Sequence, residues 1–571
     1  MDFILKLKFG EFHDISFKNG IEENIVDNII YFNSPFNNYF ISKNLLIIGA
    51  KLNTKQISYN LYNPIILRNY INTSLYYIIF IENKKLYIFN GHFNILPIYI
   101  YQFDKNIIIS SSIGLIKKYA PRININKQYI LQQNLFNYSF SNETIYKEIK
   151  LINSNSYLIF NGNLQIREFD PIEKNFVNNP VPWKESISDL IDLFIKVNRN
   201  IINDNFFISF TSGFDGRTLV ALTKSLNKEF TTFSFGTEDN EDLTLPREQA
   251  LKLGIEFFPI NLDSEEYIDN FWKLGCNIII ESGASTNFLQ VHWPYSARVL
   301  AKKTNHLVSG LFGSELFRAA HIIGQFTSPT LVDYFKYIEN DVWIEKLKNA
   351  VSLKFLNLSS FKNELNDLID YLNDYKKLIL HLNPSQRFYK YIFDEVFRKF
   401  FGLQLLQPQL KYVNVITPYL NFDFIKELLK TELAGVNNEF FTHNPIKRFK
   451  GQLFYAELIK RTWPELLYFK TGKGYKPIDL LTIWGKFNIT LNFAKKQLKR
   501  KTIAPNLDNL AIISAYTKHM EKFNSIPIVD EYFDQNYIYL LSKIHTWKSN
   551  EFLRNKFIET LSMNYYLREQ K

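Results

Sequence analysis

The first 170 residues consist largely of short apolar runs separated by Asn, Gly and Asp. Examples are NLLIIGAKL, SLYYIIFI, KKLYIFNG, LPIYIYQF, KNIIISSS and SYLIFNGNLQIREF, which are rich in β-branched and aromatic residues. Apolar and polar positions that alternate over short runs of this composition predict β-strands, mostly antiparallel. We therefore expect a β-rich domain over residues 1–170.

The pattern changes near residue 183. The segment DPIEKNFVNNPVPWKES is rich in Pro and Asn, and it predicts a linker over residues 171–186. From Trp183 onward, apolar positions first have helical spacing, and strand patterns then alternate with helix patterns. The predicted strands read FFISF, FTTFSFG, EFFPINL and HLVSGLFG, with a helix from Leu245 between the second and the third. This order predicts a doubly wound parallel sheet in a second domain over residues 187–571, which becomes helical and aromatic after about residue 330.

Composition narrows the class of protein. At 571 residues the chain is too long for one compact core. Its net charge of +11 comes mainly from scattered Lys without a dense Lys/Arg tract, so we expect no nucleic-acid partner. Cys276 is the only cysteine, which excludes internal disulfides and cysteine-based zinc sites and fits a reducing compartment.

The apolar runs also bear on location. The start of the sequence lacks the pattern of a signal peptide, and every apolar run is interrupted by charges well before the ~20 residues that a membrane helix needs. We therefore expect a cytoplasmic protein with no membrane partner. A homodimer stays open at this point.

The stretch NDNFFISFTSGFDGRTLVALTKSL combines a strand, a turn of small residues and the start of a helix. Backbone N–H groups of such a turn and the helix N-terminus behind it form a cradle for phosphate. The Gly-Lys-Ser/Thr ending of a Walker loop is absent. From these residues alone, the alternatives are a phosphate site and an ordinary glycine-containing turn.

The turn and several other segments resemble the asparagine synthetase family. Residues 211–216 (TSGFDG) resemble its SGGxDS pyrophosphate loop, and LVSGLFGSELF resembles its SGxGxDELF motif. YIFNGHFNILPIYIYQF and TIYKEIKLINSNSYL resemble elements of its glutaminase half, and VITPYLNFDFI resembles RVPFLDxxLV. These matches occur in the order of the family, from about residue 75 to 480.

The resemblance implies two domains. The first is a glutaminase of the N-terminal-nucleophile type, an αββα sandwich, and the second is a PP-loop ATP pyrophosphatase domain that uses ATP and Mg²⁺. The glutaminase requires a cysteine at position 2, where this chain has Asp2. A carboxylate cannot replace a thiolate in acyl transfer from an amide, so we expect a degenerate first domain without glutaminase activity.

The resemblance also implies site residues in the second domain. We expect ATP and its pyrophosphate at Thr211, Ser212, Gly213, Phe214, Asp215, Gly216, Arg217, Phe235, Gly236, Ser309 and Gly310. Arg217 is expected either to pair with phosphate or to lie on the helix surface. Asp215 is expected to hold Mg²⁺ together with Glu315, the only carboxylate of SGLFGSELF; the two possible alignments put either Ser314 or Glu315 at the Asp position of that motif.

Two further positions concern the second step of catalysis. The resemblance implies a catalytic glutamate four residues before Pro418, where the chain has Asn414, and an amide cannot accept the proton of the amine. It also implies a lysine that stabilises charge on the adenylated intermediate, for which LYFKTGKGYKP offers Lys473 first and Lys470 second.

The resulting hypothesis is an ATP-dependent, AMP-forming amide ligase. It would join a small-molecule or peptide carboxylate to an amine or ammonia, as in the relatives without the cysteine, which include β-lactam synthetase and the lasso peptide cyclases. The alternatives are an ammonia-dependent asparagine synthetase, which Asn414 disfavours, and a degenerate nucleotide-binding or scaffold protein, which Ser314 and Gly216 favour.

Overall fold

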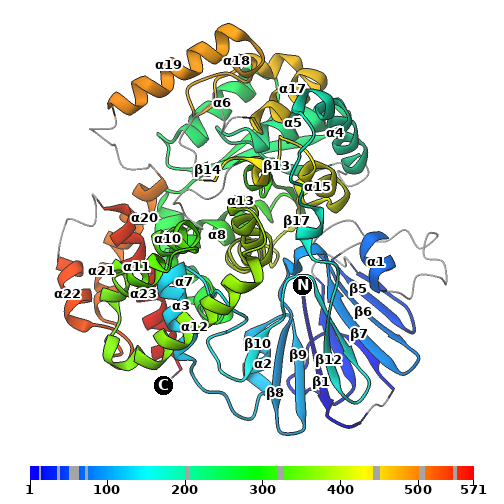
Figure 1. The fold of residues 1–571 in the computed structure, drawn as a ribbon, viewed down its shortest axis with the longest axis vertical. Coiled ribbons are helices and arrows are strands. Elements are labelled where there is room, and N and C mark those ends of the chain that lie inside the picture. Colours follow the sequence, from blue (N-terminus) through cyan, green and yellow to red (C-terminus); the bar gives the residue numbers. More distant parts are fainter. Residues whose placement is uncertain are drawn as a thin grey trace.

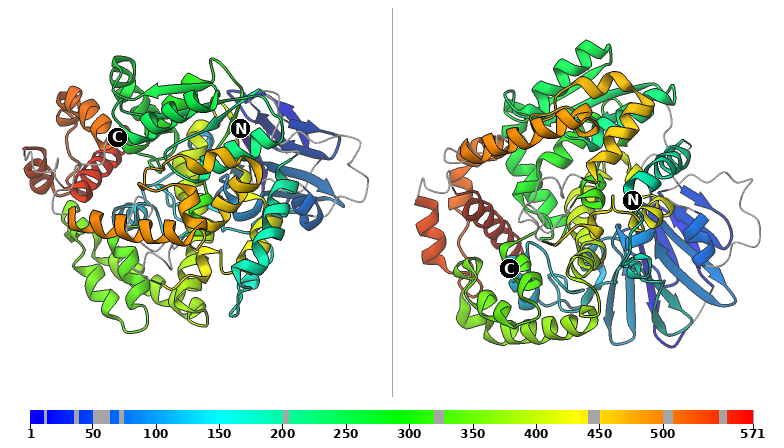
Figure 2. Two further views of the ribbon diagram at one scale, coloured as in Figure 1. Left: turned by 90° about the horizontal axis from the view of Figure 1, so that it is seen from above. Right: turned by 45° about the horizontal axis from the view of Figure 1, so that its top comes forward.

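The computed structural model describes residues 1–11, 14–34, 39–49, 64–70, 75–199, 205–318, 327–440, 450–499, 508–543 and 550–570. Figure 1 shows a β-rich half with the N-terminal strands, an α/β half above it, and a helical part beside both. Figure 2 shows from two further sides that the blue N-terminal strands and the orange to red C-terminal helices lie on opposite sides of the molecule. The fold is therefore mixed α/β with a β-rich N-terminal region, as the sequence predicts.

Two six-stranded sheets form the described part of the N-terminal region. The first has the order β10-β8-β9-β1-β3-β2 and the second the order β12-β11-β7-β6-β5-β4, and all the pairings are antiparallel except β2 with β3. Their bounds are β1 Asp2–Lys8, β2 Ser16–Asn19, β3 Ile29–Asn33, β4 Tyr39–Ile41, β5 Leu45–Ile48, β6 Tyr77–Glu82, β7 Lys85–Asn90, β8 Tyr99–Phe103, β9 Asn106–Ser110, β10 Ile149–Leu151, β11 Ser156–Phe160 and β12 Leu164–Glu168.

The two sheets face each other across an apolar core. The ring centroids of Phe3 in β1 and Tyr77 in β6 are 5.1 Å apart, which joins the two inner faces. On the outside, Leu67 of α1 (Pro64–Tyr70) packs with Ile78 and Phe80 of the second sheet, and α2 (Ile113–Tyr119) contacts β9 of the first. The arrangement is a sandwich of two sheets with thin outer helical layers.

A five-stranded parallel sheet with the order β15-β14-β13-β16-β17 forms the centre of the α/β half. Its strands are β13 Phe206–Ser209, β14 Phe230–Gly236, β15 Phe257–Asn261, β16 His306–Val308 and β17 Asn414–Ile416. The chain runs outward from β13 to β15 and then returns to place β16 on the other side of β13. Figure 1 shows α5 and α6 on one face of this sheet and α8 on the other. The order reverses between β13 and β16, and ligands bind at such a switch point in doubly wound sheets.

Helix α6 begins earlier than the sequence predicts. It spans Glu241–Leu253, so the expected start at Leu245 is wrong by four residues. The side chain of Asn240 accepts a hydrogen bond from the N–H of Asp242 and caps the helix, and Pro246 lies within it. The Asn cap and two acidic residues in the first turn outweigh the proline.

The remaining helices surround the sheet and the sandwich. Their bounds are α3 Lys127–Phe136, α4 Trp183–Asn198, α5 Asp215–Ser225, α7 Glu265–Glu281, α8 His292–Leu300, α9 Gly313–Phe317, α10 Pro329–Tyr337, α11 Val342–Lys348, α12 Lys362–Ile379, α13 Pro384–Tyr391, α14 Gln407–Gln409, α15 Phe422–Leu429, α17 Gln452–Thr462, α18 Pro477–Leu481, α19 Ile483–Lys499, α20 Asp508–Lys518, α21 Met520–Asn524, α22 Gln535–Lys543 and α23 Glu551–Arg568. Among the described residues, no helix combines the length and the apolar character needed to cross a bilayer.

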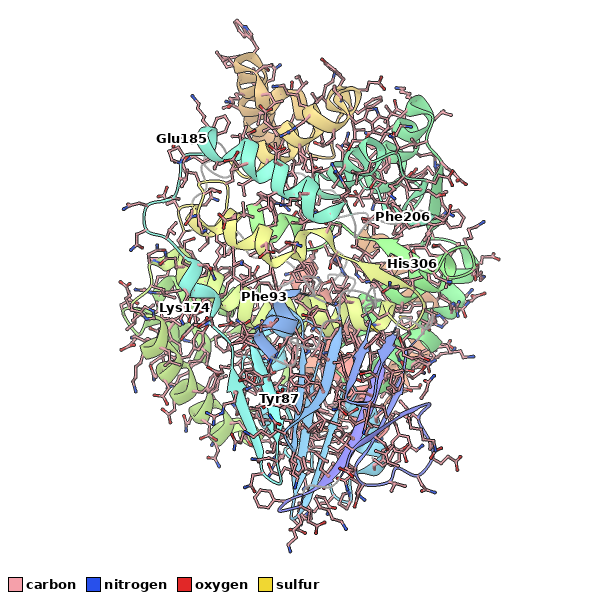
Figure 3. All side chains as sticks on the ribbon, turned by 90° about the vertical axis from the view of Figure 1, so that its right-hand side faces the viewer. Tyr87, Phe93, Lys174, Glu185, Phe206 and His306 are labelled. Atoms are coloured by element: carbon pink, nitrogen blue, oxygen red, sulfur yellow. The ribbon has the colours of Figure 1, made fainter. Side chains whose placement is uncertain are left out.

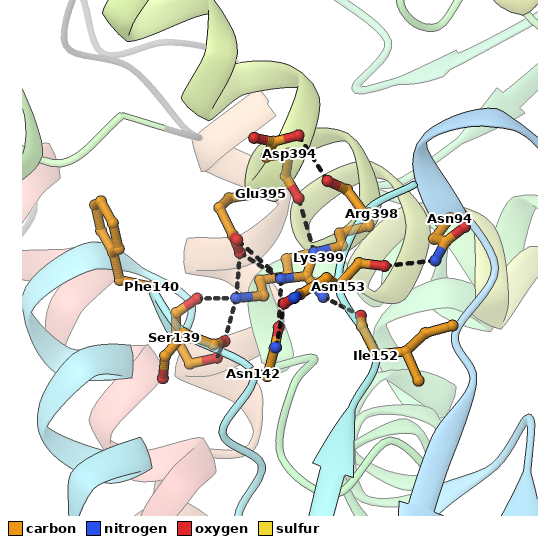
Figure 4. Close-up of polar contacts among 12 residues, drawn as sticks. Asn94, Ser139, Phe140, Asn142, Ile152, Asn153, Asp394, Glu395, Arg398 and Lys399 are labelled. Atoms are coloured by element: carbon orange, nitrogen blue, oxygen red, sulfur yellow. Dashed lines mark hydrogen bonds and ion pairs between the residues drawn. The ribbon is translucent and has the colours of Figure 1, made fainter. Parts of the chain in front are cut away.

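A π-helix, η9 (Ile392–Leu406), joins the two halves. Figure 3 labels Phe93 where the upper ends of the N-terminal strands meet the helical layer, and its ring stacks on that of Phe393 in η9 at 5.2 Å. Figure 4 shows the polar part of this contact, in which Arg398 donates to the carbonyl of Ile152 and Lys399 donates to the carbonyl of Ser139. Arg398 and Lys399 both pair with Glu395, so buried charges of η9 are satisfied by the N-terminal region and by each other.

Candidate nucleotide site

The predicted phosphate loop lies at the switch point of the parallel sheet. Strand β13 ends at Ser209 and helix α5 begins at Asp215, so the loop connects the carboxyl end of a central strand to a helix N-terminus. Ser309 and Gly310 follow the neighbouring strand β16. Both loops line one cavity of about 200 Å³, to which Thr211, Asp215 and Gly216 contribute together with Ser309, Gly310 and Glu315.

Two glycines of these loops have no room for a side chain. A Cβ atom on Gly216 would lie 2.2 Å from the carbonyl oxygen of Ser209. A Cβ atom on Gly310 would lie 2.9 Å from the backbone nitrogen of Gly216. These contacts explain why the chain has glycine at both positions.

Asp215 is held by side chains from distant parts of the sequence. Ser314 in α9 donates a hydrogen bond of 2.5 Å to its Oδ2, and Arg318 donates to the hydroxyl of Ser314. The hydroxyl of Tyr419 donates to the backbone carbonyl of Asp215 at 3.0 Å. Ser314, a residue of the predicted second motif, therefore contacts Asp215 directly.

Glu315 lies in the same cavity as Asp215. Burial, and second the charge of Asp215, raise the pKa of Glu315 to about 7, while Arg318 opposes the shift. Two carboxylates this close favour a cation between them and the phosphates, and a hard cation prefers oxygen ligands. No cluster of three or more His, Cys, Asp and Glu occurs in the described ranges, so water and phosphate oxygens would complete the shell of a Mg²⁺ ion here. The donor set fits Mg²⁺.

The wall of the cavity away from the loop is apolar and aromatic. Phe235, at the end of β14, packs edge-on against Trp293 of α8 with ring centroids 5.1 Å apart, and Phe233 and Leu300 extend this wall. Aromatic walls of this kind suit a flat base. Gly236 lies beside the wall, where its carbonyl accepts from the N–H of Leu262 at 2.8 Å.

The rest of the predicted loop is backed by a second loop. Ser212 donates its N–H to Oδ1 of Asp242 at 2.9 Å, and its carbonyl accepts from Gly472 at 3.0 Å. The N–H of Gly213 donates to the hydroxyl of Thr211 at 3.2 Å. Phe214 is buried beneath the loop, and Nζ of Lys473 lies 5.5 Å from the centre of its ring. The structure thus brings Lys473 to the predicted phosphate loop.

Arg217 does not lie on the helix surface. Its side chain is fully buried, and its guanidinium donates to the carbonyls of Phe469 at 3.4 Å and Lys470 at 3.0 Å. Burial lowers the pKa of Arg217 to about 9. Arg217 therefore fixes the loop that carries the lysines, while the side chain of Lys470 is exposed.

Two other predicted positions lie away from this site. Asn414 is the first residue of β17 and pairs with His306, the first residue of β16, so it lies at the amino ends of the strands, opposite the loop. Asp2 begins β1, where its Oδ1 accepts from the hydroxyl of Ser111 at 3.3 Å. It lines a separate cavity of about 280 Å³ together with Lys411.

A larger cavity of about 630 Å³ adjoins the nucleotide cavity, and we call it the α23 cavity. Thr211, Phe235 and Trp293 line both cavities. Its other wall comes from the start of α23, with Glu551 and Glu559. Neither Asp242 nor this wall was predicted as part of the site. The acidic run EDNED, which follows the second strand of the sheet, was a signal for Asp242. Helix α23 is more than 300 residues from the loop and carries no comparable signal.

Comparison with known proteins gives limited similarity. No protein-family model matches the chain, and no curated protein matches it. Among solved structures, NMN synthetase from Francisella tularensis is 16% identical, with 22% of this chain and 52% of that chain covered at a TM-score of 0.17. NH3-dependent NAD synthetase from Campylobacter jejuni is 15% identical, with 36% of this chain and 95% of that chain covered at a TM-score of 0.18. The chain thus spans about half of the NMN synthetase.

Proposed function

We propose that the protein is an ATP-dependent, AMP-forming amide ligase. One observation carries the proposal: the loop of residues 211–217 and the loop after β16 line one cavity, in which Asp215 and Glu315 lie beside an aromatic wall. ATP with Mg²⁺ has the complementary groups, which are a flat base, an anionic phosphate chain and a hard cation. The order of motifs that resembles the asparagine synthetase family supports AMP formation over ADP formation.

The proposed reaction has two steps. A carboxylate oxygen of the substrate attacks the α-phosphorus of ATP, the bond from that phosphorus to the oxygen bridging to the β-phosphate breaks, and pyrophosphate leaves. The nitrogen of an amine or ammonia then attacks the acyl carbon, and the bond from that carbon to the AMP oxygen breaks. The nitrogen releases a proton to solvent, and the products are an amide and AMP.

The residues of the chain act in this scheme by binding and orientation. The start of α5 would face the phosphates, and Asp215 and Glu315 would hold Mg²⁺, which when bound neutralises phosphate charge. Lys473, or less directly Lys470, stabilises the oxyanion of the second step. Because Asp2 stands where a glutaminase needs its cysteine, the nitrogen comes from free ammonia or an amine and not from glutamine.

The test is ATP–pyrophosphate exchange, because exchange reports the first step without knowledge of the amine. Labelled pyrophosphate, ATP and Mg²⁺ are incubated with a panel of small-molecule and peptide carboxylates that includes aspartate. We expect label in ATP that depends on one class of carboxylate and on Mg²⁺. Release of ADP and phosphate would contradict the proposal, and exchange with aspartate and amide formation from ammonium alone would support the asparagine synthetase alternative.

A second candidate is nucleotide binding without turnover. It is favoured by the hydrogen bond from Ser212 to Asp242, because a carboxylate of the chain there takes a loop N–H that a phosphate would use. Titration calorimetry with ATP and Mg²⁺ separates the two candidates. ATP binding without exchange for any carboxylate of the panel would favour the second.

A further inference from the structure

The α23 cavity presents one face of a helix to the predicted phosphate loop. Glu551, Asn555 and Glu559 follow one another at intervals of four residues, so they form a single stripe along the first turns of α23. All three line the cavity, and Thr211 lines it from the side of the loop. A molecule in this cavity would touch the stripe and the loop together.

The wall of this cavity is acidic. Within the described part of the chain, its charged residues are Asp242, Glu551, Glu559 and Lys556, with a formal charge of −2. Lys556 and Glu559 form an ion pair, with Nζ of Lys556 donating to Glu559 at 2.6 Å and to Asn137 at 2.9 Å, so the net negative charge lies on Glu551 and Asp242. His292 adds no positive charge at neutral pH, because burial lowers its pKa to about 4. The cavity therefore favours a cationic group.

Polar atoms of the wall lack partners within the described part of the chain. Ser234, at the end of β14, is 2% exposed, and its hydroxyl has no hydrogen-bond partner there. Oδ1 of Asn555, in the middle of the acidic stripe, also has none. A buried polar group without a partner is costly, and a carboxamide oxygen among carboxylates is satisfied by an N–H donor. Both atoms indicate a polar ligand.

The size and the apolar part of the wall indicate more than ammonia. A water-sized molecule takes up roughly 30 Å³, whereas the cavity measures about 630 Å³, within the ~300–1,000 Å³ of sites for organic ligands. Phe400 and Leu405 of η9, Ile512 of α20 and Phe552 of α23 supply an apolar surface beside the stripe. The ligand therefore has an apolar skeleton as well as a charge.

We propose that the α23 cavity binds an organic primary amine in its ammonium form. The ammonium lies on the stripe of Glu551, Asn555 and Glu559, and the skeleton lies against Phe400, Leu405 and Ile512. Its role as the nitrogen substrate rests on the proposed function, whereas its binding does not. The proposal replaces free ammonia by a bound amine as the nitrogen donor. The ammonium releases one proton to solvent before its nitrogen attacks the acyl carbon, and a second proton leaves after the C–N bond forms.

Titration calorimetry on the full chain with three probes of one shape tests the proposal. The probes are 2-phenylethylamine, the neutral 2-phenylethanol and the anionic 3-phenylpropionate. We expect the amine to bind at least about 10-fold more tightly than the other two. Binding of the amine should weaken about 10-fold or more in Glu551→Gln, whose side chain is exposed at the start of α23 and whose replacement preserves the fold. Glu345→Gln, an exposed carboxylate on α11, is the matched control and should bind as the parent does.

Glu559→Gln provides a second variant. This variant removes the charged partner of Lys556, whose side chain is 3% exposed. The thermal stability of Glu559→Gln is therefore measured first. If Glu559→Gln does not fold, the test relies on Glu551→Gln. Equal or tighter binding of the alcohol or the carboxylate would overturn the proposal, and so would failure of all three probes to bind. Amine binding without pyrophosphate exchange would refute the proposed function alone. A different result would refute this inference alone. In that result the protein catalyses pyrophosphate exchange and forms an amide from ammonium chloride, and the amine does not inhibit this amide formation.

Discussion

The hydroxyl of Ser314 donates a 2.5 Å hydrogen bond to Oδ2 of Asp215, although the two residues are 99 positions apart. Arg318, one turn further along, donates to the same hydroxyl, so three residues form a line that fixes the carboxylate at the cavity wall. The backbone of Asp215 is fixed as well, by Tyr419. A residue at a helix N-terminus whose side chain and backbone are both held is arranged to bind a ligand in one geometry.

We expect Asp215→Asn to abolish pyrophosphate exchange, with a loss on the order of 10²-fold or more, and to leave the fold intact. The amide has the shape of the carboxylate and can still accept from Ser314, but it lacks the charge that would hold Mg²⁺. Exchange rates and thermal unfolding are compared with Asp189→Asn, an exposed carboxylate on α4. Exchange at the parental rate would show that Asp215 does not hold the metal.

Replacing Gly216 tests whether the local packing requires glycine at this position. The resemblance puts Ser there, but a Cβ atom would lie 2.2 Å from the carbonyl oxygen of Ser209. We expect Gly216→Ser to lower the free energy of unfolding by about 1–3 kcal/mol. Gly213→Ala is the control, because its Cβ would lie 3.3 Å from the side-chain hydroxyl of Thr211 and would meet no backbone atom within 4 Å. Equal stability of the two variants in urea would contradict this reasoning.

The sequence indicated more of the fold than of the site. Alternating runs and the strand–helix rhythm predicted the β-rich N-terminal region and the parallel sheet, because each depends on local pattern. The loop at Asp215 was found because its small residues and helix start are consecutive in the sequence. Trp293 and Glu559 were missed, because only the packing of α8 and α23 brings them to that loop. The carbonyl contacts of Arg217 were not predicted, since its partners lie about 250 residues away.

We expect Arg217→Met to destabilise the protein through the loop of residues 469–476. The guanidinium donates to the carbonyls of Phe469 and Lys470, and losing hydrogen bonds to a charged group costs about 1.5–3 kcal/mol. Urea unfolding and limited proteolysis of this loop measure the effect. Arg247→Met, which breaks an exposed ion pair with Glu238, should cost less than about 1 kcal/mol. Unchanged stability combined with weaker ATP binding would instead assign Arg217 to phosphate.

Lys399 makes stability depend on pH. Burial, and less strongly the charge of Arg398, lower the pKa of Lys399 to about 7, while Glu395 opposes the shift. The unfolded lysine has its ordinary pKa of 10.5, so between these values the unfolded state binds more protons and stability rises with pH. Below about pH 7 both states are protonated, so Lys399 gives the free energy of unfolding no dependence on pH. Above about pH 7 the free energy of unfolding rises by at most about 1.4 kcal/mol per pH unit. We expect Lys399→Met to lack this slope in urea unfolding between about pH 6 and 9. A variant that keeps the parental slope would show that another group titrates.

Lys473 separates the two proposed steps. Its Nζ lies 5.5 Å from the ring of Phe214, and the neighbouring Gly472 is bonded to Ser212, so the lysine is held near the phosphate loop. A fixed positive charge there would stabilise the oxyanion that forms when the amine attacks, and its loss is expected to slow amide formation by about 10²-fold or more. Pyrophosphate exchange, which ends before that attack, should persist in Lys473→Met. Lys470→Met tests the second candidate, whose side chain is exposed and whose backbone is held by Arg217. Lys486→Met, at an exposed lysine on α19, is the matched control and should form product at the parental rate. If Lys473→Met forms product at the parental rate, the oxyanion is stabilised by other groups. If it loses exchange as well, the lysine acts already on the triphosphate.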